Sequence, residues 1–184
     1  MSILKVARMG HPVLKQKAKV IPKSWFKTPE LLRLIQDMHD TMDEYGGIGL
    51  AAPQVHESWQ LAIIRFGGSH EKGLKYLTSK APSRGSTIFI NPKIKILNPK
   101  KQIFWEGCLS IPELRGQVAR PCQIQVDFFN EKGNPQRLQA SGFVATVIQH
   151  ELDHLKGILY PQRMKDLSTL SFTDEWERFK NQEK

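Results

Sequence analysis

Residues 150–154, with the sequence HELDH, constrain this chain more than any other stretch because they point to one particular helix. On an α-helix, their four-residue spacing puts His150 and His154 on one face, about 6 Å apart along the axis, where both imidazoles can bind one metal ion. Glu151 then lies beside the ion without being needed as a ligand. Apolar residues precede the motif at helical spacing: Phe143, Val144, Val147 and Ile148. The pattern favours a core-facing metal-binding helix over residues 142–156, and a surface helix of solvated charges is the alternative.

Two further helices are expected near the two ends of the chain. Thr28 and Pro29 suit an N-cap and a first helical position, and the pair Gly46-Gly47 ends that helix. Its expected core face consists of Leu31, Leu32, Ile35, Met38 and Met42. The aromatic residues Phe172, Trp176 and Phe179, at positions i, i+4 and i+7, predict a final amphipathic helix docked on the core. Ser141 and Gly157 are the expected cap and end of the metal-binding helix.

The middle of the chain has the pattern of short strands. They are expected at residues 61–66, 87–90, 94–97, 102–105 and 123–129. A polar loop with Gly and Ser is expected over residues 67–85. The order helix, strands, helix, helix indicates an α+β fold, with antiparallel or mixed sheets around the metal-binding helix. A length of 184 residues fits one domain over residues 1–184.

Composition narrows the class of protein. No apolar run is long enough to span a bilayer, and the N-terminus lacks the apolar core of a secretory signal, so we expect a cytoplasmic protein that does not enter membranes. In that reducing setting Cys108 and Cys122 are expected to be free thiols, with Cys122 in a structural role. The chain carries 27 Lys and Arg against 18 Asp and Glu, a net charge of +9, and residues 1–34 are strongly basic. Attraction to ribosomal RNA and a merely solvated lysine-rich face both explain this charge, and no motif for specific DNA recognition accompanies it.

A catalytic zinc-type site usually has three protein ligands and a position open to water, so a third ligand is needed. Tyr160 occupies the position where a third histidine stands in one class of metalloproteases. Glu175, 21 residues after His154, is the candidate expected for a peptidase. Cys108 follows the 102–105 strand as another candidate, although a lone cysteine is most often a small apolar residue. For the function of the whole protein, a ribosome-associated binding module with a closed structural metal site is an alternative to an enzyme.

Three motifs together bear on the choice among these alternatives for the third ligand: GIGLAAPQ at residues 47–54, EGCLS at 106–110 and QHELDH at 149–154. Their order and spacing resemble the signature motifs of peptide deformylases, and RMGHPVL at 8–14 is similar to that family's N-terminal segment. The resemblance implies that Cys108, His150 and His154 bind one divalent metal ion, typically Fe(II), with Zn, Ni or Co able to substitute. It also implies that the protein removes the formyl group from N-formyl-methionyl nascent peptides, with proximity to the ribosome.

The resemblance assigns the remaining catalytic roles. Gln54, through its amide, and Leu109, through its backbone N–H, would stabilise the oxyanion that forms at the formyl carbonyl. We assign Glu151 as the general base that takes a proton from water and delivers it to the departing amine. Asp153 and Arg120 match positions that pair beneath the site and hold it in place, with a solvated, unpaired aspartate as the alternative.

The substrate is expected to lie extended along the site. The resemblance places its backbone near Ile48 and Gly107, with Arg115 near its chain. Gly49 suggests close approach of the substrate backbone, and a simple turn is the alternative explanation of this glycine. Three residues share the metal face of the helix and are the candidate walls of a methionine pocket: Phe143, Thr146 and Val147. Ordinary core packing explains these three residues equally well.

Overall fold

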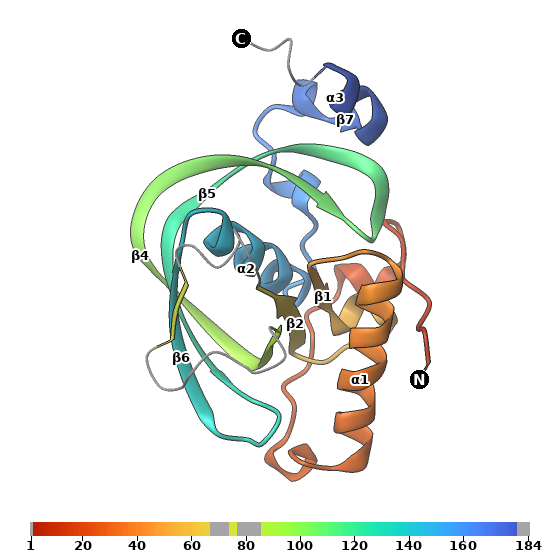
Figure 1. Cartoon of the computed structure of the whole chain (residues 1–184), viewed down its shortest axis with the longest axis vertical. Helices are drawn as coiled ribbons and strands as arrows, with labels where there is room; N and C mark the ends of the chain where they lie inside the picture. The colour runs from red at the N-terminus through yellow and green to blue at the C-terminus, as the bar shows by residue number, and fades with distance from the viewer. Residues whose placement is uncertain (1, 67–73, 77–85, 180–184) are drawn as a thin grey trace.

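The structure is a computed structural model that describes residues 2–66, 74–76 and 86–179 (Figure 1). Among these residues the α-helices are α1 (Pro29–Glu44), α2 (Gly142–His154) and α3 (Thr173–Phe179). The strands are β1 (Gly49–Ala51), β2 (Leu61–Arg65), β3 (Leu74–Tyr76), β4 (Ser86–Cys108), β5 (Ile111–Phe129), β6 (Pro135–Ser141) and β7 (Ser171–Phe172). No described helix has the length and apolar character needed to cross a membrane.

One antiparallel sheet organises the described residues. Its strand order is β1-β2-β4-β5-β6-β3, and β7 pairs with β5. Figure 1 shows the long strands β4 and β5 curving around α2, which lies inside the curl. The buried face of α2 packs on the sheet through a core that includes Ile64, Phe89, Val126 and Ile148. The prediction of an α+β fold around the helix that carries His150 and His154 is therefore confirmed.

The N-terminal helix forms as its sequence predicts. The Thr28 hydroxyl accepts a hydrogen bond from the Leu31 N–H at 3.3 Å, so Thr28 caps α1 as expected. Four of the five predicted core residues are buried against the sheet: Leu31, Ile35, Met38 and Met42. The fifth, Leu32, is 44% exposed because one residue advances a helix by about 100°, which turns Leu32 away from the face that Leu31 begins.

The predicted boundaries between strands were wrong. The predicted strands at 87–90, 94–97 and 102–105 are parts of the single strand β4, which pairs with β5 along nearly its whole length. Pro92 and Pro99 lie where the pairing register shifts, and these irregularities interrupt the alternating pattern without ending the strand. Likewise β5 begins at Ile111, well before the predicted 123. Residues 74–76 of the predicted 67–85 loop form β3 on β6, and the rest of that loop lies outside the described residues.

Three details of the predicted helices also differ. Helix α2 ends at His154 rather than residue 156, and Ser141 stands at its N-cap without a capping side-chain hydrogen bond. Gly142, the first residue of α2, has a φ of 63°, so the chain enters the helix by a sharp turn instead of an ordinary cap. Helix α3 begins at Thr173, so Phe172 lies in β7 and not in the predicted helix. The helix does not dock on the core: Phe172 and Phe179 are 59% and 45% exposed, and Trp176 packs on Trp105 of β4.

Candidate metal centre and its cleft

The end of β4 and the helix α2 bring three ligand-type side chains together. One ligand atom from each of Cys108, His150 and His154 lies within 4.8 Å of the others. The Cys108 Sγ is 3.3 Å from the His154 Nε2, and the two imidazole rings are 5.1 Å apart at a steep angle of 77°. A thiolate and two imidazoles are a ligand set that suits zinc, iron and similar divalent ions. The three residues therefore fit a single metal ion, with the cysteine supplied from outside the helix.

The rival third ligand does not join this cluster. Glu175 lies on α3, where its carboxylate accepts a hydrogen bond from Arg178 at 2.9 Å and is about half exposed. Among the described residues, the group of three or more ligand-type side chains is Cys108 with the two histidines. Tyr160 is buried and its ring lies near-parallel to that of His150, with 6.2 Å between centroids. The geometry thus contradicts the peptidase-like ligand set.

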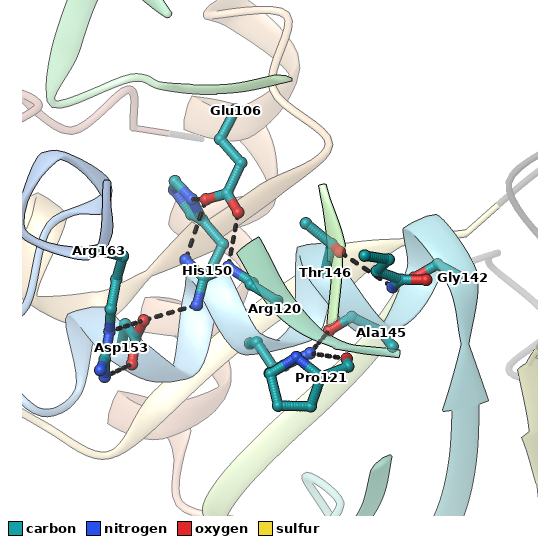
Figure 2. Close-up of polar contacts among 11 residues, drawn as sticks. Glu106, Arg120, Pro121, Gly142, Ala145, Thr146, His150, Asp153 and Arg163 are labelled. Carbon is teal, nitrogen blue, oxygen red and sulfur yellow. Dashed lines mark hydrogen bonds and ion pairs between the residues drawn. The ribbon is translucent and has the colours of Figure 1, made fainter. Parts of the chain in front are cut away.

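A buried ionic network holds the first histidine (Figure 2). The Nδ1 of His150 is 2.7 Å from the Glu106 carboxylate, and Arg120 donates two hydrogen bonds to that carboxylate at 2.6 and 3.0 Å. Arg120 also donates to Asp153 at 2.7 Å, and Arg163 donates to the same aspartate at 2.8 and 3.0 Å. With Nδ1 directed at Glu106, the Nε2 of His150 is the nitrogen available to a metal.

The network includes contacts that sequence reasoning had not found. Pairing of Asp153 with Arg120 agrees with the expectation from the resemblance, whereas Glu106 and Arg163 had no assigned role. Glu106 was within reach of sequence reasoning, because it stands two residues before Cys108 in the EGCLS motif, on the same face of the strand. Arg163 carried no such signal, since its contact depends on how the chain returns after α2.

Burial and the neighbouring cationic groups act in opposite directions on the pKa of each carboxyl group in this network. Burial alone would raise the pKa of Glu106, but hydrogen bonds to His150 and Arg120 lower it below its usual value. Burial likewise acts against ionised Asp153, and Arg163 and Arg120 lower the pKa of that carboxyl. Both groups are therefore carboxylates at neutral pH.

Glu151 has a different environment. Its side chain is 5% exposed, and burial raises its pKa to about 7. A carboxyl group with this pKa can both take and release a proton near neutral pH. Gly49 lies directly against it: a Cβ built at that position would overlap the Glu151 carboxylate. Burial also lowers the pKa of His154 well below its usual value. Burial acts in the same direction on His150, but its hydrogen bonds with Cys108 and Glu106 raise the pKa of that imidazole well above its usual value.

A cleft of about 930 Å³ opens over these groups. The predicted site residues along its wall are Ile48, Gly49, Gln54, Gly107, Cys108, Leu109, Arg115, Phe143, His150 and Glu151. The Gln54 amide donates to the Cys108 Sγ at 3.5 Å and to the Ser110 hydroxyl at 3.2 Å, while its oxygen accepts from the Ala51 N–H. The side-chain amide is thus held in one orientation beside the metal cluster.

A second cavity of about 80 Å³ adjoins the cleft beside α2. Its lining includes all three candidate walls of the methionine pocket: Phe143, Thr146 and Val147. Thr146 and Val147 are buried, and Trp105 of β4 also lines the cavity. All three residues therefore border an open cavity, which packing within the core alone does not explain.

Comparison with known proteins decides the family. Residues 3–169 match the family model described as polypeptide deformylase. The chain belongs to the polypeptide deformylase family. It is 41% identical over 169 residues to peptide deformylase 2 of Ralstonia nicotianae, an alignment that covers 92% of this chain and 91% of the relative. It is 43% identical over 169 residues to peptide deformylase 1 of Nitrosomonas europaea, covering 92% of each.

Solved deformylase structures share the fold. An actinonin-bound class I type b peptide deformylase from Acinetobacter baumannii is 32% identical, with a TM-score of 0.77, and the match covers 90% of this chain and 100% of that one. The Thermotoga maritima peptide deformylase gives the same identity, coverage and TM-score. This deformylase is therefore a metal-dependent hydrolase that removes the N-formyl group from new polypeptides, and its Cys-His-His cluster can bind the metal.

Proposed function

We propose that Cys108, His150 and His154 hold the catalytic metal of this deformylase, and that Fe(II) is the ion bound in the cell, with Zn, Ni or Co able to replace it. The observation that carries this proposal is the convergence of three ligand atoms within 4.8 Å, two of them from residues that line the cleft, Cys108 and His150, beside a buried glutamate. A divalent ion held there supplies Lewis acidity, which polarises a carbonyl and makes water easier to deprotonate near neutral pH.

Glu151 is the proposed general base. Its burial and its pKa of about 7 suit a group that takes a proton from the attacking water and returns it to the departing amine nitrogen. The Gln54 amide and the Leu109 N–H are the proposed donors to the developing oxyanion. The fixed orientation of Gln54 beside Cys108 supports this role, and removal of one such donor typically raises a barrier by about 3 kcal/mol.

The proposed substrate path follows the cleft. A formyl-methionyl peptide would lie extended past Ile48, Gly49 and Gly107, with Arg115 beside its chain and the methionine side chain in the cavity that Phe143, Thr146 and Val147 border. A class I type b deformylase from Acinetobacter baumannii was solved with Met-Ala-Ser bound, which supports a peptide that begins with methionine as a ligand. A formyl group carries only hydrogen on its acyl carbon, so we expect an N-acetyl peptide to be cleaved far more slowly.

The cellular setting is also a proposal. We place the enzyme in the cytoplasm as one domain over residues 1–184, close to the ribosome that supplies its substrate and without specific DNA binding. The basic segment 1–34 supports attraction to ribosomal RNA through nonspecific charge.

A formate-release assay on a formyl-Met peptide, with anaerobic purification and metal analysis, tests the assignment. Cys108→Ala should lose both metal and activity, whereas Glu175→Ala should keep the metal. Glu151→Gln should keep the metal and lose turnover. Near-normal turnover by metal-loaded Glu151→Gln would remove the glutamate from the mechanism, and metal loss in Glu175→Ala but not Cys108→Ala would revive the peptidase alternative.

A further inference from the structure

The chain continues past the part that matches the family model, and this continuation reaches the cleft. The model match ends at residue 169, after which come β7 and α3. Ser171 of β7 pairs with Arg115 of β5, and Arg115 pairs in turn with Gly107 of β4, one residue before the metal ligand Cys108. Figure 1 shows β7 and α3 lying beyond the curved β4–β5 ribbon. Backbone pairing therefore fixes α3 relative to the metal site.

Trp176 is a residue of α3 that reaches the cleft. The Arg115 guanidinium carbon lies 4.4 Å from the centre of the Trp176 ring, and the Trp105 ring is 5.5 Å away on the other strand. Trp176 and Thr173 line the same cleft as Cys108 and His150. An otherwise exposed two-turn helix thus contributes an aromatic wall to the substrate cleft.

Arg115 gains a fixed position from this contact. Within the part of the chain that the structure describes, no carboxylate forms an ion pair with Arg115, and its Nε is buried without a hydrogen-bond partner. Stacking on the indole stabilises the planar cation and limits its rotamers. Its unused N–H groups are then held ready for carbonyl oxygens of a bound peptide.

The proposed path of the substrate beside Gly107 indicates which part of a peptide would arrive there. An extended peptide that runs along β4 from Cys108 past Gly107 advances about 3.3 Å per residue, so three residues cover about the distance from Cys108 to Trp105. A peptide whose formyl group is at the metal would bring its third residue to the level of Trp105, whose ring contacts Trp176.

We propose that Trp176 is a specificity-determining residue, which forms with Arg115 a subsite for the third residue of the formylated peptide. The indole offers an apolar surface to that residue's side chain, and the stacked guanidinium donates to its backbone carbonyl. This inference rests on the proposed function of the Cys108–His150–His154 site, because that site sets where the formyl end lies. Peptides of at least three residues are the substrates that profit from it.

The test compares two substrates, formyl-Met-Ala and formyl-Met-Ala-Leu-Ser, in the metal-loaded full-length enzyme. Trp176→Ala should raise the KM for the tetrapeptide about tenfold relative to the dipeptide, and Trp176→Phe should recover most of that loss because it restores an aromatic face. Phe179→Ala is the matched control, since Phe179 is on the same helix, is 45% exposed and does not line the cleft. Metal content and thermal midpoint are measured for each variant to confirm that the fold is kept.

The outcomes separate the two proposals. Release of formate from the dipeptide by the wild-type enzyme reports on the metal site itself, so failure there counts against the proposed function. A tetrapeptide preference that is lost in Trp176→Ala and returns in Trp176→Phe supports the subsite. Equal KM changes for both substrates, no change for either, or an equal effect of Phe179→Ala would overturn it.

Discussion

Replacing Arg120 by methionine tests the buried ionic network beneath the metal site. Arg120 is 4% exposed and donates two hydrogen bonds to Glu106 and one to Asp153. Methionine keeps much of the side-chain volume but leaves the Glu106 carboxylate with only His150 as its partner in the network, whereas Asp153 keeps Arg163. Loss of one partner of a buried ion pair typically costs about 3–5 kcal/mol, and we expect about 4 kcal/mol here because Glu106 is left almost unpaired.

Urea unfolding followed by circular dichroism measures this free energy of unfolding. A loss of that size is a large fraction of the roughly 5–15 kcal/mol that stabilises a domain, so Arg120→Met should fold but unfold at a much lower urea concentration. Arg137→Met is the control, because Arg137 forms its ion pair with Asp127 on the exposed face of the sheet and should change the midpoint little. The double variant Arg120→Met/Glu106→Gln should recover part of the loss, since it removes the stranded charge. A loss below about 1 kcal/mol in Arg120→Met, or an equal loss in the control, would refute the reasoning.

Three shorter predictions concern the same region. The pKa of Asp153 is lowered in the folded state, so the stabilisation that this carboxylate provides is present at neutral pH and is lost as the pH falls through that pKa. The thermal midpoints of the wild type and Asp153→Asn should therefore converge as the pH is lowered from neutral to strongly acid values. A constant gap between the two midpoints would contradict this prediction. Gly49→Ala should displace the Glu151 carboxylate and lower kcat at least about tenfold with metal content unchanged, and wild-type kcat would count against the close approach. Glu106→Gln removes the charged acceptor of His150 and should weaken metal affinity about 10- to 100-fold in a chelator competition, whereas an unchanged affinity would show that the contact does not support the ligand.

Local patterns in the sequence determined the elements that one stretch of chain can specify alone. The capped helix after Thr28 and the histidine helix formed where periodicity placed them, because a 3.6-residue repeat of apolar side chains is read within a single segment. The HELDH spacing likewise determined two candidate ligands and the neighbouring glutamate. The third ligand stayed open between Cys108 and Glu175 on residue chemistry, and the resemblance of three motifs favoured Cys108.

Tertiary structure decided what depends on contacts between distant segments. The curl of β4 and β5 around α2 brings Cys108 to the histidines and Glu106 to His150, and no local repeat encodes that curvature. The pairing register shifts at Pro92 and Pro99, so β4 continues past both prolines as one strand. The alternating pattern had predicted separate strands there. The aromatic spacing in α3 predicted a helix on the core, yet the pairing of β7 with β5 placed Trp176 at the cleft instead. Periodicity defines which face of an element is apolar, but the surface that covers this face is chosen by the rest of the fold.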